Sequence, residues 1–213
     1  GEDSFTVTLS DGEGGTVEVT VPVTVDAVND DPETVGTIEA QTAEDAEAIN
    51  WDVSGYFKDV DEDTLTYSVS GLPSGLTIDA ASGVISGTID NSASQSGPYS
   101  VSVTASDGKG GTDATHTFTW TVTNPAPTAD GEQAITTYED TPVEGQITAT
   151  DKDGDELTYT IAEGEGPTNG TVTLDPATGA YTYTPAENFN GEDSFTVTVS
   201  DGEGGTVKVT VPV

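Results

Sequence analysis

The sequence contains no cysteine, and only four of its 213 residues are lysine or arginine. The lack of cysteine excludes disulfide bonds and thiol chemistry, so cysteine usage does not indicate a redox compartment. Against the four basic residues stand 39 aspartates and glutamates, which give a formal net charge of −35. Such a charge argues against nucleic acid and anionic membranes as partners and favours cations. No apolar run approaches the roughly 20 residues of a membrane span, so we expect no membrane insertion.

Helical patterning is also missing, and apolar residues instead alternate with threonine, serine or charged residues. The alternation is clear in FTVTL (5–9), VEVTVPV (17–23), FTWTV (118–122) and FTVTVS (195–200). A period of two residues is typical of antiparallel strands that bury one face. Turn sequences such as LPSG, DPATG and the repeated SDGxGG separate these runs. The predicted fold class is therefore all-β.

The first 23 and the last 23 residues of the sequence are nearly identical. Residues 1–23 recur as 191–213, and only two pairs of positions differ, Leu9 against Val199 and Glu18 against Lys208. A match this close is typical of a tandem array. We expect the chain to be one period of a longer polypeptide, cut at an arbitrary phase rather than at a domain boundary.

A weaker repeat lies inside the long one. DVDEDTLTYSV (59–69) resembles DKDGDELTYTI (151–161), and PYSVSVTASDGKGGT (98–112) resembles DSFTVTVSDGEGGT (193–206). The matched segments follow one another in the same order along the chain. We therefore expect two homologous modules in each period.

Each module is predicted to have seven strands, A to G, which is the count of an immunoglobulin-like sandwich. In the first whole module the strands fall near 35–42, 47–57, 64–70, 75–79, 83–89, 98–106 and 112–123. In the second they fall near 132–138, 143–150, 157–162, 170–174, 180–185, 193–200 and 206–213. We predict tandem seven-stranded immunoglobulin- or cadherin-like β-sandwiches arranged as a rod.

The predicted units are residues 1–27, 28–124 and 125–213. The first is only the F–G hairpin and linker of a severed module, and an isolated two-stranded hairpin is marginal in water. Both linkers, VDAVNDDP (25–32) and TNPAP (123–127), carry proline, which stiffens them. We expect the hairpin to pair with another copy, head to tail, and to complete its module. Such a contact propagates as a filament.

Acidic residues gather in loops that the topology brings to the module junctions. The loops between strands B and C carry an Asp-x-Asp-x-Asp spacing, which lets successive side chains turn toward one hard cation such as calcium. At the first junction the candidate ligands are Glu2, Asp3, Asp26, Asn29, Asp30, Asp59, Asp61, Asp63 and Asp107. At the second they are Glu44, Asp45, Asn124, Asp151, Asp153, Asp155 and Asp201.

The two junctions are not expected to be equal. The second linker offers only Asn124, so we predict fewer or weaker calcium ions there than at the first junction. Among the four basic residues, Lys58 alone is expected close to the first acidic cluster. Without a cation, the clustered carboxylates would repel one another strongly.

Several motifs together resemble bacterial cadherin-like repeats of giant extracellular adhesins of the RTX type. They are the linker VNDDP, the pairs AED (43–45) and YED (138–140), the loops DVDED and DKDGD, and the SDGxGG turn. LPSGLTIDAASGVISGT (72–88) resembles the dystroglycan-type variety, and GAYTYTPAENFNGEDSF (179–195) the tandem type. The resemblance implies a secreted bacterial rod with calcium between modules, and it adds Glu139 and Glu192 to the candidate metal ligands.

Three functions follow as alternatives. The first is a calcium-stiffened spacer of an extracellular or cell-surface adhesin or filament, whose partners are neighbouring repeats. The second is a carbohydrate-binding module of a polysaccharide-degrading enzyme, with Trp51, Tyr56, Phe57 or Tyr138 stacking on a glycan. The third is an enzyme with paired acids. Because each acid cluster lies in a repeated turn, and His116 has no nucleophilic partner motif, we predict no catalytic activity.

Overall fold

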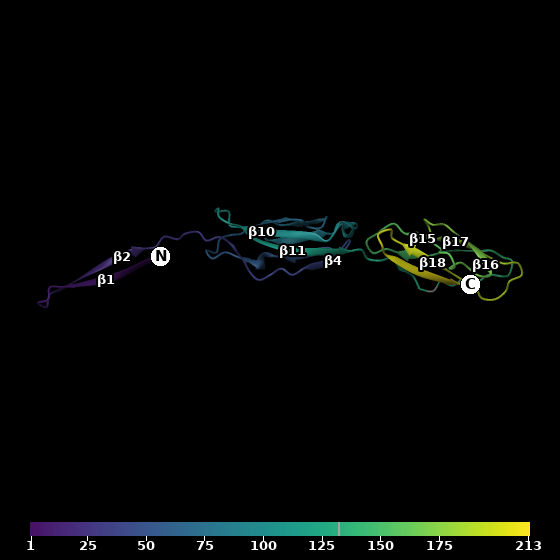
Figure 1. The fold of residues 1–213 in the computed structure, drawn as a ribbon, viewed down its shortest axis with the longest axis horizontal. Coiled ribbons are helices and arrows are strands. Elements are labelled where there is room, and N and C mark those ends of the chain that lie inside the picture. The colour runs from purple at the N-terminus through teal and green to yellow at the C-terminus, as the bar shows by residue number, and fades with distance from the viewer. Residues whose placement is uncertain (132) are drawn as a thin grey trace.

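The computed structural model describes residues 1–131 and 133–213, and strands account for nearly all of its regular structure. A two-stranded hairpin and two β-sandwiches follow one another along the long axis, with the hairpin at one end (Figure 1). Two short 3-10 turns, Ser54–Tyr56 and Ala93–Ser96, interrupt the first sandwich. Within the described residues, no helix is long and apolar enough to cross a membrane.

The hairpin consists of β1 (Glu2–Ser10) and β2 (Thr16–Thr24), which pair antiparallel along their whole length. Its turn is the first SDGEGG segment, in which the Asp11 carboxylate accepts hydrogen bonds from the backbone N–H groups of Glu13 and Gly15 at 2.9 and 2.8 Å. The apolar residues of the two strands lie on the surface; Phe5, for example, is 54% exposed. The hairpin therefore has strand pairing but no core.

The first sandwich packs two sheets against each other. Its strands are β3 (Glu33–Thr34), β4 (Gln41–Glu44), β5 (Ala48–Asp52), β6 (Phe57–Lys58), β7 (Thr66–Ser70), β8 (Leu76–Ile78), β9 (Val84–Thr88), β10 (Tyr99–Ser106) and β11 (Ala114–Thr123). One sheet has the order β4-β11-β10-β7, the other β5-β9-β8, and β3 pairs with β6. Val53, Ile85, Val101 and Val103 are fully buried between the sheets.

The second sandwich repeats this plan. Its strands are β12 (Thr128–Ala129), β13 (Val143–Gln146), β14 (Ala149–Thr150), β15 (Thr158–Thr160), β16 (Gly170–Leu174), β17 (Ala180–Pro185), β18 (Ser194–Ser200) and β19 (Thr206–Pro212). The sheets have the orders β15-β18-β19 and β13-β17-β16, and β12 pairs with β14. Tyr183, Phe195, Val197 and Val211 are buried in a separate hydrophobic core. The predicted class of tandem all-β sandwiches is confirmed.

Strand A is where the prediction is wrong in both sandwiches. In the first, the strand expected at 35–42 is split into β3 and β4, which pair with different sheets, and Gly36 between them has a positive φ of 65°. A strand that crosses between sheets must leave the ladder, and alternation alone does not show where. In the second, 133–138 contains no strand, β12 begins earlier, and Glu132 lies outside the described residues.

Strand B is also interrupted in both modules. In the first, the 3-10 turn at Ser54–Tyr56 divides the expected 47–57 into β5 and β6. In the second, β13 and β14 lie within the expected 143–150, but Ile147 and Thr148 between them belong to neither strand. The interruption lets the two halves of strand B pair with different neighbours, β6 with β3 and β14 with β12.

The two copies of the repeated hairpin have the same register in different surroundings. Phe5 faces Val21 and Val7 faces Val19, just as Phe195 faces Val211 in the second copy. Phe195 is 1% exposed, and its ring meets Tyr181 edge-on at a centroid distance of 5.1 Å. The local sequence therefore sets the strand pairing, and the surroundings decide whether the apolar face is covered.

This pair of copies gives a matched test of what burial contributes. Phe195→Ala should destabilise the second sandwich by about 3–5 kcal/mol, because it removes a buried ring. Phe5→Ala should change stability by less than about 0.5 kcal/mol, because that ring is largely in water. Amide hydrogen exchange of residues 194–200 would measure the first effect. Equal effects of the two substitutions would contradict the structure.

Asp193 is a hydrogen-bonding centre just before β18. Its carboxylate accepts backbone N–H groups of Thr168 and Asn169, both at 2.9 Å, and the Tyr183 hydroxyl at 3.0 Å. Burial alone would raise the pKa of Asp193, but these bonds lower it. Burial and the neighbouring Asp193 carboxylate raise the pKa of Tyr183 to about 12. Asp193 thus ties strands E and F to the loop at 168–169.

Because the folded state lowers the pKa of Asp193, its contribution is present above the ordinary aspartate range and is lost as the pH falls through the lowered value. Asp193→Asn should cost the second sandwich about 1–3 kcal/mol at pH 7, since it weakens several bonds to a buried carboxylate. It should also reduce the loss of stability below pH 4. Urea unfolding at several pH values would measure both effects. The equivalent Asp3→Asn in the exposed hairpin is the control, and an unchanged acid dependence would contradict the assignment.

Candidate metal centres at the module junctions

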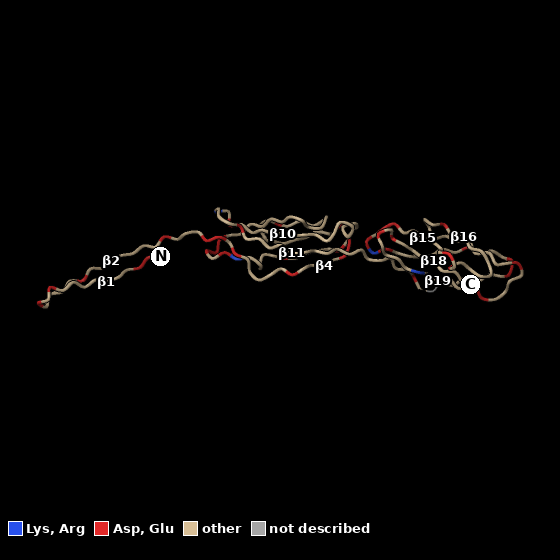
Figure 2. Tube along the Cα trace, viewed as in Figure 1, with Lys and Arg blue, Asp and Glu red and all other residues tan. Residues whose placement is uncertain are grey.

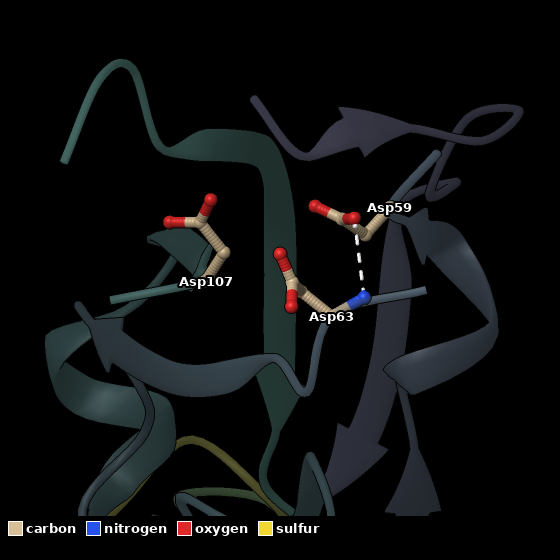
Figure 3. Close-up of side chains that lie close together, drawn as sticks. All are labelled: Asp59, Asp63 and Asp107. Atoms are coloured by element: carbon tan, nitrogen blue, oxygen red, sulfur yellow. Dashed lines mark hydrogen bonds between the residues drawn. The ribbon is translucent and has the colours of Figure 1, made fainter. Parts of the chain in front are cut away.

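Three aspartates converge at the end of the first sandwich that the linker from the hairpin enters. Asp59 and Asp63 come from the B–C loop and Asp107 from the F–G turn, and one carboxylate oxygen of each lies within 4.8 Å of the others (Figure 3). The loop holds its shape because Asp59 Oδ1 accepts the backbone N–H groups of Asp61 and Asp63 at 2.9 and 3.2 Å. Asp59 Oδ2 is buried and has no hydrogen-bond partner in the described part of the chain.

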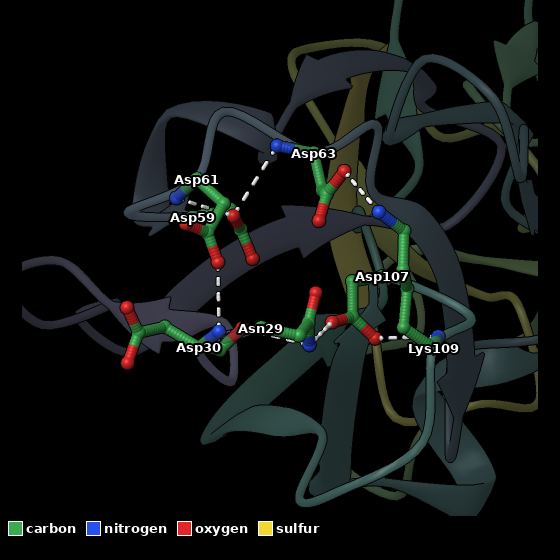
Figure 4. Close-up of polar contacts among 7 residues, drawn as sticks. All are labelled: Asn29, Asp30, Asp59, Asp61, Asp63, Asp107 and Lys109. Carbon is green, nitrogen blue, oxygen red and sulfur yellow. Dashed lines mark hydrogen bonds and ion pairs between the residues drawn. The ribbon is translucent and has the colours of Figure 1, made fainter. Parts of the chain in front are cut away.

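The incoming linker meets this cluster. Asn29 donates its side-chain amide to Asp107 Oδ2 at 2.7 Å, and the backbone N–H of Asp30 donates to Asp61 Oδ2 at 2.7 Å (Figure 4). Asn29 therefore approaches the cluster with its side chain, whereas Asp30 contacts it through the backbone. The side-chain hydrogen bond from Asn29 is the main cause of the lowered pKa of Asp107. The linker and the loops were expected together, and the structure brings them together.

The lysine closest to the first cluster is Lys109. Its ammonium pairs with Asp63 Oδ1 at 2.7 Å, and this contact raises the pKa of Lys109 (Figure 4). Lys58, which was expected in this role, instead pairs with Glu33 at 2.9 Å on the surface. The expectation failed because Lys109 occupies the variable position of the SDGxGG turn, which points back over the B–C loop. The first cluster therefore carries its own partial counter-charge.

The second cluster lies in the B–C loop of the second sandwich. Oxygens of Asp151, Asp153 and Asp155 come within 4.8 Å of one another. Asp151 Oδ1 accepts the backbone N–H groups of residues 153, 154 and 155 at 3.1 to 3.4 Å, which curls the loop and turns the side chains inward. Gly154 has a φ of 90°, a value that suits glycine at this bend. Both carboxylate oxygens of Asp153 are buried without a hydrogen-bond partner among the described residues.

Residues from both sandwiches and the linker surround this loop. Asp45, at the bottom of the first sandwich, is 1% exposed and accepts the backbone N–H of Ser94 at 3.0 Å. Asp201, in the F–G turn, is 5% exposed and accepts the side-chain amide of Asn124 at 2.9 Å. The buried oxygens without a partner in the described chain are Asp45 Oδ2, Asn124 Oδ1, Asp151 Oδ2, Asp153 Oδ1 and Oδ2, Asp155 Oδ2 and Glu203 Oε2.

Mutual repulsion and burial make these carboxylates reluctant to ionise together. Burial, followed by the neighbouring Asp151 carboxylate, raises the pKa of Asp153 to about 7. Burial, followed by the charges of Glu203, Asp151, Asp201 and Asp45, raises the pKa of Asp155. Burial opposes ionisation of Asp151 as well, but the hydrogen bonds that it accepts from the backbone N–H groups of residues 153 to 155 lower its pKa. At neutral pH the second cluster therefore holds more acidic groups than the positive charge around it can balance.

Many acidic residues lie in the backbone segments where the sandwiches meet their linkers, and the few basic residues are widely spaced (Figure 2). At the second junction, Lys152 pairs with Glu44 across the two sandwiches, and the described structure shows no ion pair between Lys152 and Asp153 or Asp155. Seven buried oxygens lack a partner here, against one at the first junction, when the described residues are compared. Buried oxygens without a partner are therefore more numerous at the second junction, whereas the linker sequences predicted the stronger calcium site at the first; the number of ions at each junction stays a prediction.

The remaining predicted ligands are not drawn into these two groups of three aspartates. Glu2 and Asp3 lie on exposed β1, and Asp26 lies in the exposed linker. Glu139 and Glu192 are exposed in the second sandwich and belong to neither of the two groups found among the described residues. Asp61 turns its carboxylate to the backbone N–H of Asp30, and Glu44 pairs with Lys152. Among the described residues, the structure thus brings B–C loop aspartates together and leaves the A–B glutamates Glu44 and Glu139 outside the two groups.

Glu203 was missed by sequence reasoning. It occupies the same position of the SDGxGG turn as Lys109, and its Oε2 is buried without a partner in the described chain. The side-chain amide of Gln95, from the first sandwich, donates to the backbone oxygen of Glu203 at 3.5 Å. The sequence signal for Glu203 was the SDGxGG turn, because its variable position is lysine at the first junction and glutamate at the second.

The aromatic residues considered for glycan stacking are mostly packed inside. Trp51 meets Phe118 and Trp120 edge-on or nearly so, at centroid distances of 5.7 and 5.8 Å, and Phe57 is buried. Tyr138 is 83% exposed. His116 is half-buried between the rings of Tyr56 and Phe57. Apart from Tyr138, these aromatic side chains therefore pack in or against the core and do not form a flat surface on which a sugar ring could stack.

Comparison with protein families divides the chain between two models. Residues 32–123 match the family described as "Putative Ig domain", and residues 124–213 match the family described as "Bacterial Ig domain". Each match covers one of the two sandwiches. They support an immunoglobulin-like repeat of the bacterial kind, in agreement with the fold.

Among curated proteins, the chain is similar to sphingomyelinases of Mycobacterium tuberculosis and Mycobacterium bovis, with 34% identity over 83 residues. That match covers 38% of this chain and 17% of the length of those relatives. Among solved structures it is similar to protocadherin gammaB7 (17% identity, 99% of this chain and 58% of that chain, TM-score 0.49) and to an endo-fucoidan hydrolase of glycoside hydrolase family 107 (20% identity, 100% and 33%, TM-score 0.40).

Proposed function

We propose that this chain is a structural repeat of a bacterial extracellular or cell-surface protein, in which calcium bound between modules stiffens a rod. Its units are residues 1–27, 28–124 and 125–213. The observation that carries the proposal is the set of buried carboxylate oxygens without hydrogen-bond partners at the second junction, on Asp45, Asp153 and Asp155. Buried charges are costly unless they are paired or coordinate a metal.

A hard divalent cation suits these donors. Calcium takes six to eight oxygen ligands at flexible geometry, whereas magnesium keeps several waters and uses one or two carboxylates. The second junction offers carboxylates from the B–C loop, from Asp201 and Glu203 in the F–G turn, and from Asp45, together with the Asn124 amide oxygen. The proposed ion would replace like-charge repulsion by attraction to a common centre.

The donors come from both sides of the joint, and this explains how binding would stiffen it. Asp45 belongs to the bottom of the first sandwich, Asn124 to the linker, and the B–C loop to the top of the second sandwich. One ion bound by all three would oppose bending at the linker. Without it, repulsion among the carboxylates would push the sandwiches apart. Extracellular modules bind calcium with dissociation constants of about 0.1–1 mM, which suits a secreted rod.

Calcium should therefore stabilise and straighten the molecule. At a free concentration 100 times the dissociation constant, it should stabilise the second sandwich by about 2.7 kcal/mol. Thermal melting and small-angle scattering, each in calcium, in magnesium and in EDTA, would measure stability and the largest dimension of the particle. If calcium left both unchanged relative to EDTA, the proposal would be wrong.

Asp153→Asn separates repulsion from binding, because it should act in opposite directions in the two buffers. In EDTA it removes a buried charge and should raise the transition of the second sandwich by roughly 1 kcal/mol, or about 4–8 °C. In calcium the same variant should be less stable than the wild type, because a ligand is lost. Melting curves in both buffers measure the reversal. A uniform shift in both would indicate a structural effect alone.

Asp201→Asn and Asp11→Asn form a second matched pair. Each aspartate accepts the N–H groups two and four residues later in an identical SDGEGG turn, but Asp11 is fully exposed and Asp201 faces the second cluster. Asp201→Asn should weaken calcium affinity about tenfold or more, since it removes a ligand or a partner of one. Asp11→Asn should leave the affinity unchanged. Isothermal titration would measure both, and equal effects would exclude a role specific to the junction.

A carbohydrate-binding role remains the alternative. Phe57 is buried, and Trp51 and Tyr56 are half-buried against the first core, which leaves Tyr138 as the exposed member of the four candidates within the described structure. One tyrosine gives a smaller stacking surface than the row of rings that this alternative requires. The adhesin spacer therefore explains more of the structure, and we propose that the chain is not itself catalytic.

A further inference from the structure

The two acidic clusters share one hydrogen-bonded framework. Asp59 at the first junction and Asp151 at the second accept the backbone N–H groups two and four residues later in the B–C loop. In each F–G turn the aspartate accepts the side-chain amide of a linker asparagine, from Asn29 at 2.7 Å at the first junction and from Asn124 at 2.9 Å at the second. Side chains at equivalent positions of the two clusters can therefore be compared one by one.

One pair of equivalent positions differs in the sign of its charges. At the first junction the ammonium of Lys109 pairs with Asp63 Oδ1 at 2.7 Å (Figure 4). At the second, the same two positions hold Glu203 and Asp155, and the charge of Glu203 is, after burial, the largest cause of the raised pKa of Asp155. Glu203 Oε2 and Asp155 Oδ2 are both buried without a hydrogen-bond partner among the described residues. An attraction at one junction is thus a repulsion at the other.

A third acid faces the second pair from the preceding sandwich. Asp45 is 1% exposed, its Oδ2 has no hydrogen-bond partner in the described chain, and its charge also raises the pKa of Asp155. Buried carboxylate oxygens in this arrangement require a cation. At the first junction the ammonium of Lys109 already stands beside the equivalent carboxylate, and it would repel a second cation brought there.

Direct hydrogen bonds already hold the linker at the first junction. The backbone N–H of Asp30 donates to Asp61 Oδ2 at 2.7 Å, and Asp31 Oδ2 accepts the backbone N–H of Thr112 at 3.0 Å. A Cβ on Gly111 would clash with the Asp31 carboxylate, so glycine at this place in the F–G turn lets the linker approach. None of these contacts needs a metal ion.

We propose that the variable residue of the SDGxGG turn determines the source of the cation at each junction. Lys109 supplies the positive charge from the chain itself, so calcium binds weakly at the first junction and the linker keeps its contacts without it. Glu203 leaves the equivalent place at the second junction to a divalent cation from solution. This inference rests on the proposed function of calcium at the second junction. It reverses the order of calcium affinity that the linker sequences predict.

Reciprocal substitutions in the full chain test the inference. Calcium is titrated into each variant, and the backbone amide NMR signals of residues 59–63 and 151–155 report binding at the first and second junctions separately. In the wild type, the second set should respond at calcium concentrations at least about tenfold below those that move the first. Lys109→Glu should strengthen binding at the first junction about tenfold or more, because a carboxylate replaces the competing ammonium. Glu203→Lys should weaken binding at the second by a similar factor.

Matched variants separate the local charge from the net charge of the chain. Lys109→Arg keeps the ammonium's charge and should leave calcium binding at the first junction as in the wild type. Lys208→Glu changes the net charge as Lys109→Glu does, but on β19, where Lys208 pairs with Glu165, and it should not change binding at the first junction. Glu13→Lys, in the exposed turn of the hairpin, is the corresponding control for Glu203→Lys.

The inference is overturned if Lys109→Glu binds calcium at the first junction no more tightly than the wild type does. It is equally overturned if Glu203→Lys leaves binding at the second junction unchanged, or if the wild type binds equally well at both. In each of these cases calcium still binds at the second junction, so the proposed function survives. Calcium that moves neither set of amides in the wild type would instead contradict the proposed function and this inference together.

Discussion

Repulsion between carboxylates at the joint of two sandwiches is the interaction around which the rest of this structure is arranged. The loops that carry the acids are short and are held by their own backbone hydrogen bonds, as Asp151 holds the loop that follows it. Those bonds fix the side chains in place before any partner arrives. The fold thus keeps like charges close together, and their electrostatic repulsion depends on how much positive charge lies among them.

The two junctions differ in how the repulsion between their carboxylates is compensated. At the first, Lys109 and Asn29 contact the acids directly, and Asp59 Oδ2 is the one buried carboxylate oxygen without a partner among the described residues of the cluster. At the second, the equivalent of Lys109 is Glu203, the acids are more deeply buried, and Lys152 is engaged with Glu44. A change of residue type at the variable position of a repeated turn, from Lys109 to Glu203, therefore contributes to the different electrostatics of the two joints.

Much of the fold could be predicted from the sequence, because alternation and turn chemistry are local. Strands C to G lie within about two residues of their predicted positions in both sandwiches. Strand A could not be predicted, because its course depends on which sheet it joins, and that is decided by tertiary pairing with β6 and β11. For the site, the Asp-x-Asp-x-Asp loops were recognisable from spacing. The role of Glu203 and the position of Lys109 required the orientation of one turn over another.

The parallel pairing of β4 with β11 also has a mechanical consequence. Gln41 to Glu44 lie beside Trp120 to Thr123; β3 precedes β4 where the chain enters the sandwich, and the chain leaves through β11. Tension along the rod pulls these neighbours in opposite directions along their length, so their hydrogen bonds share the load and must break together. In the described part of the second sandwich, the corresponding contact is one backbone bond from Ile135 to Pro212. At this place in the described second sandwich, a shearing load would therefore be shared by fewer backbone hydrogen bonds than at β4 and β11 of the first.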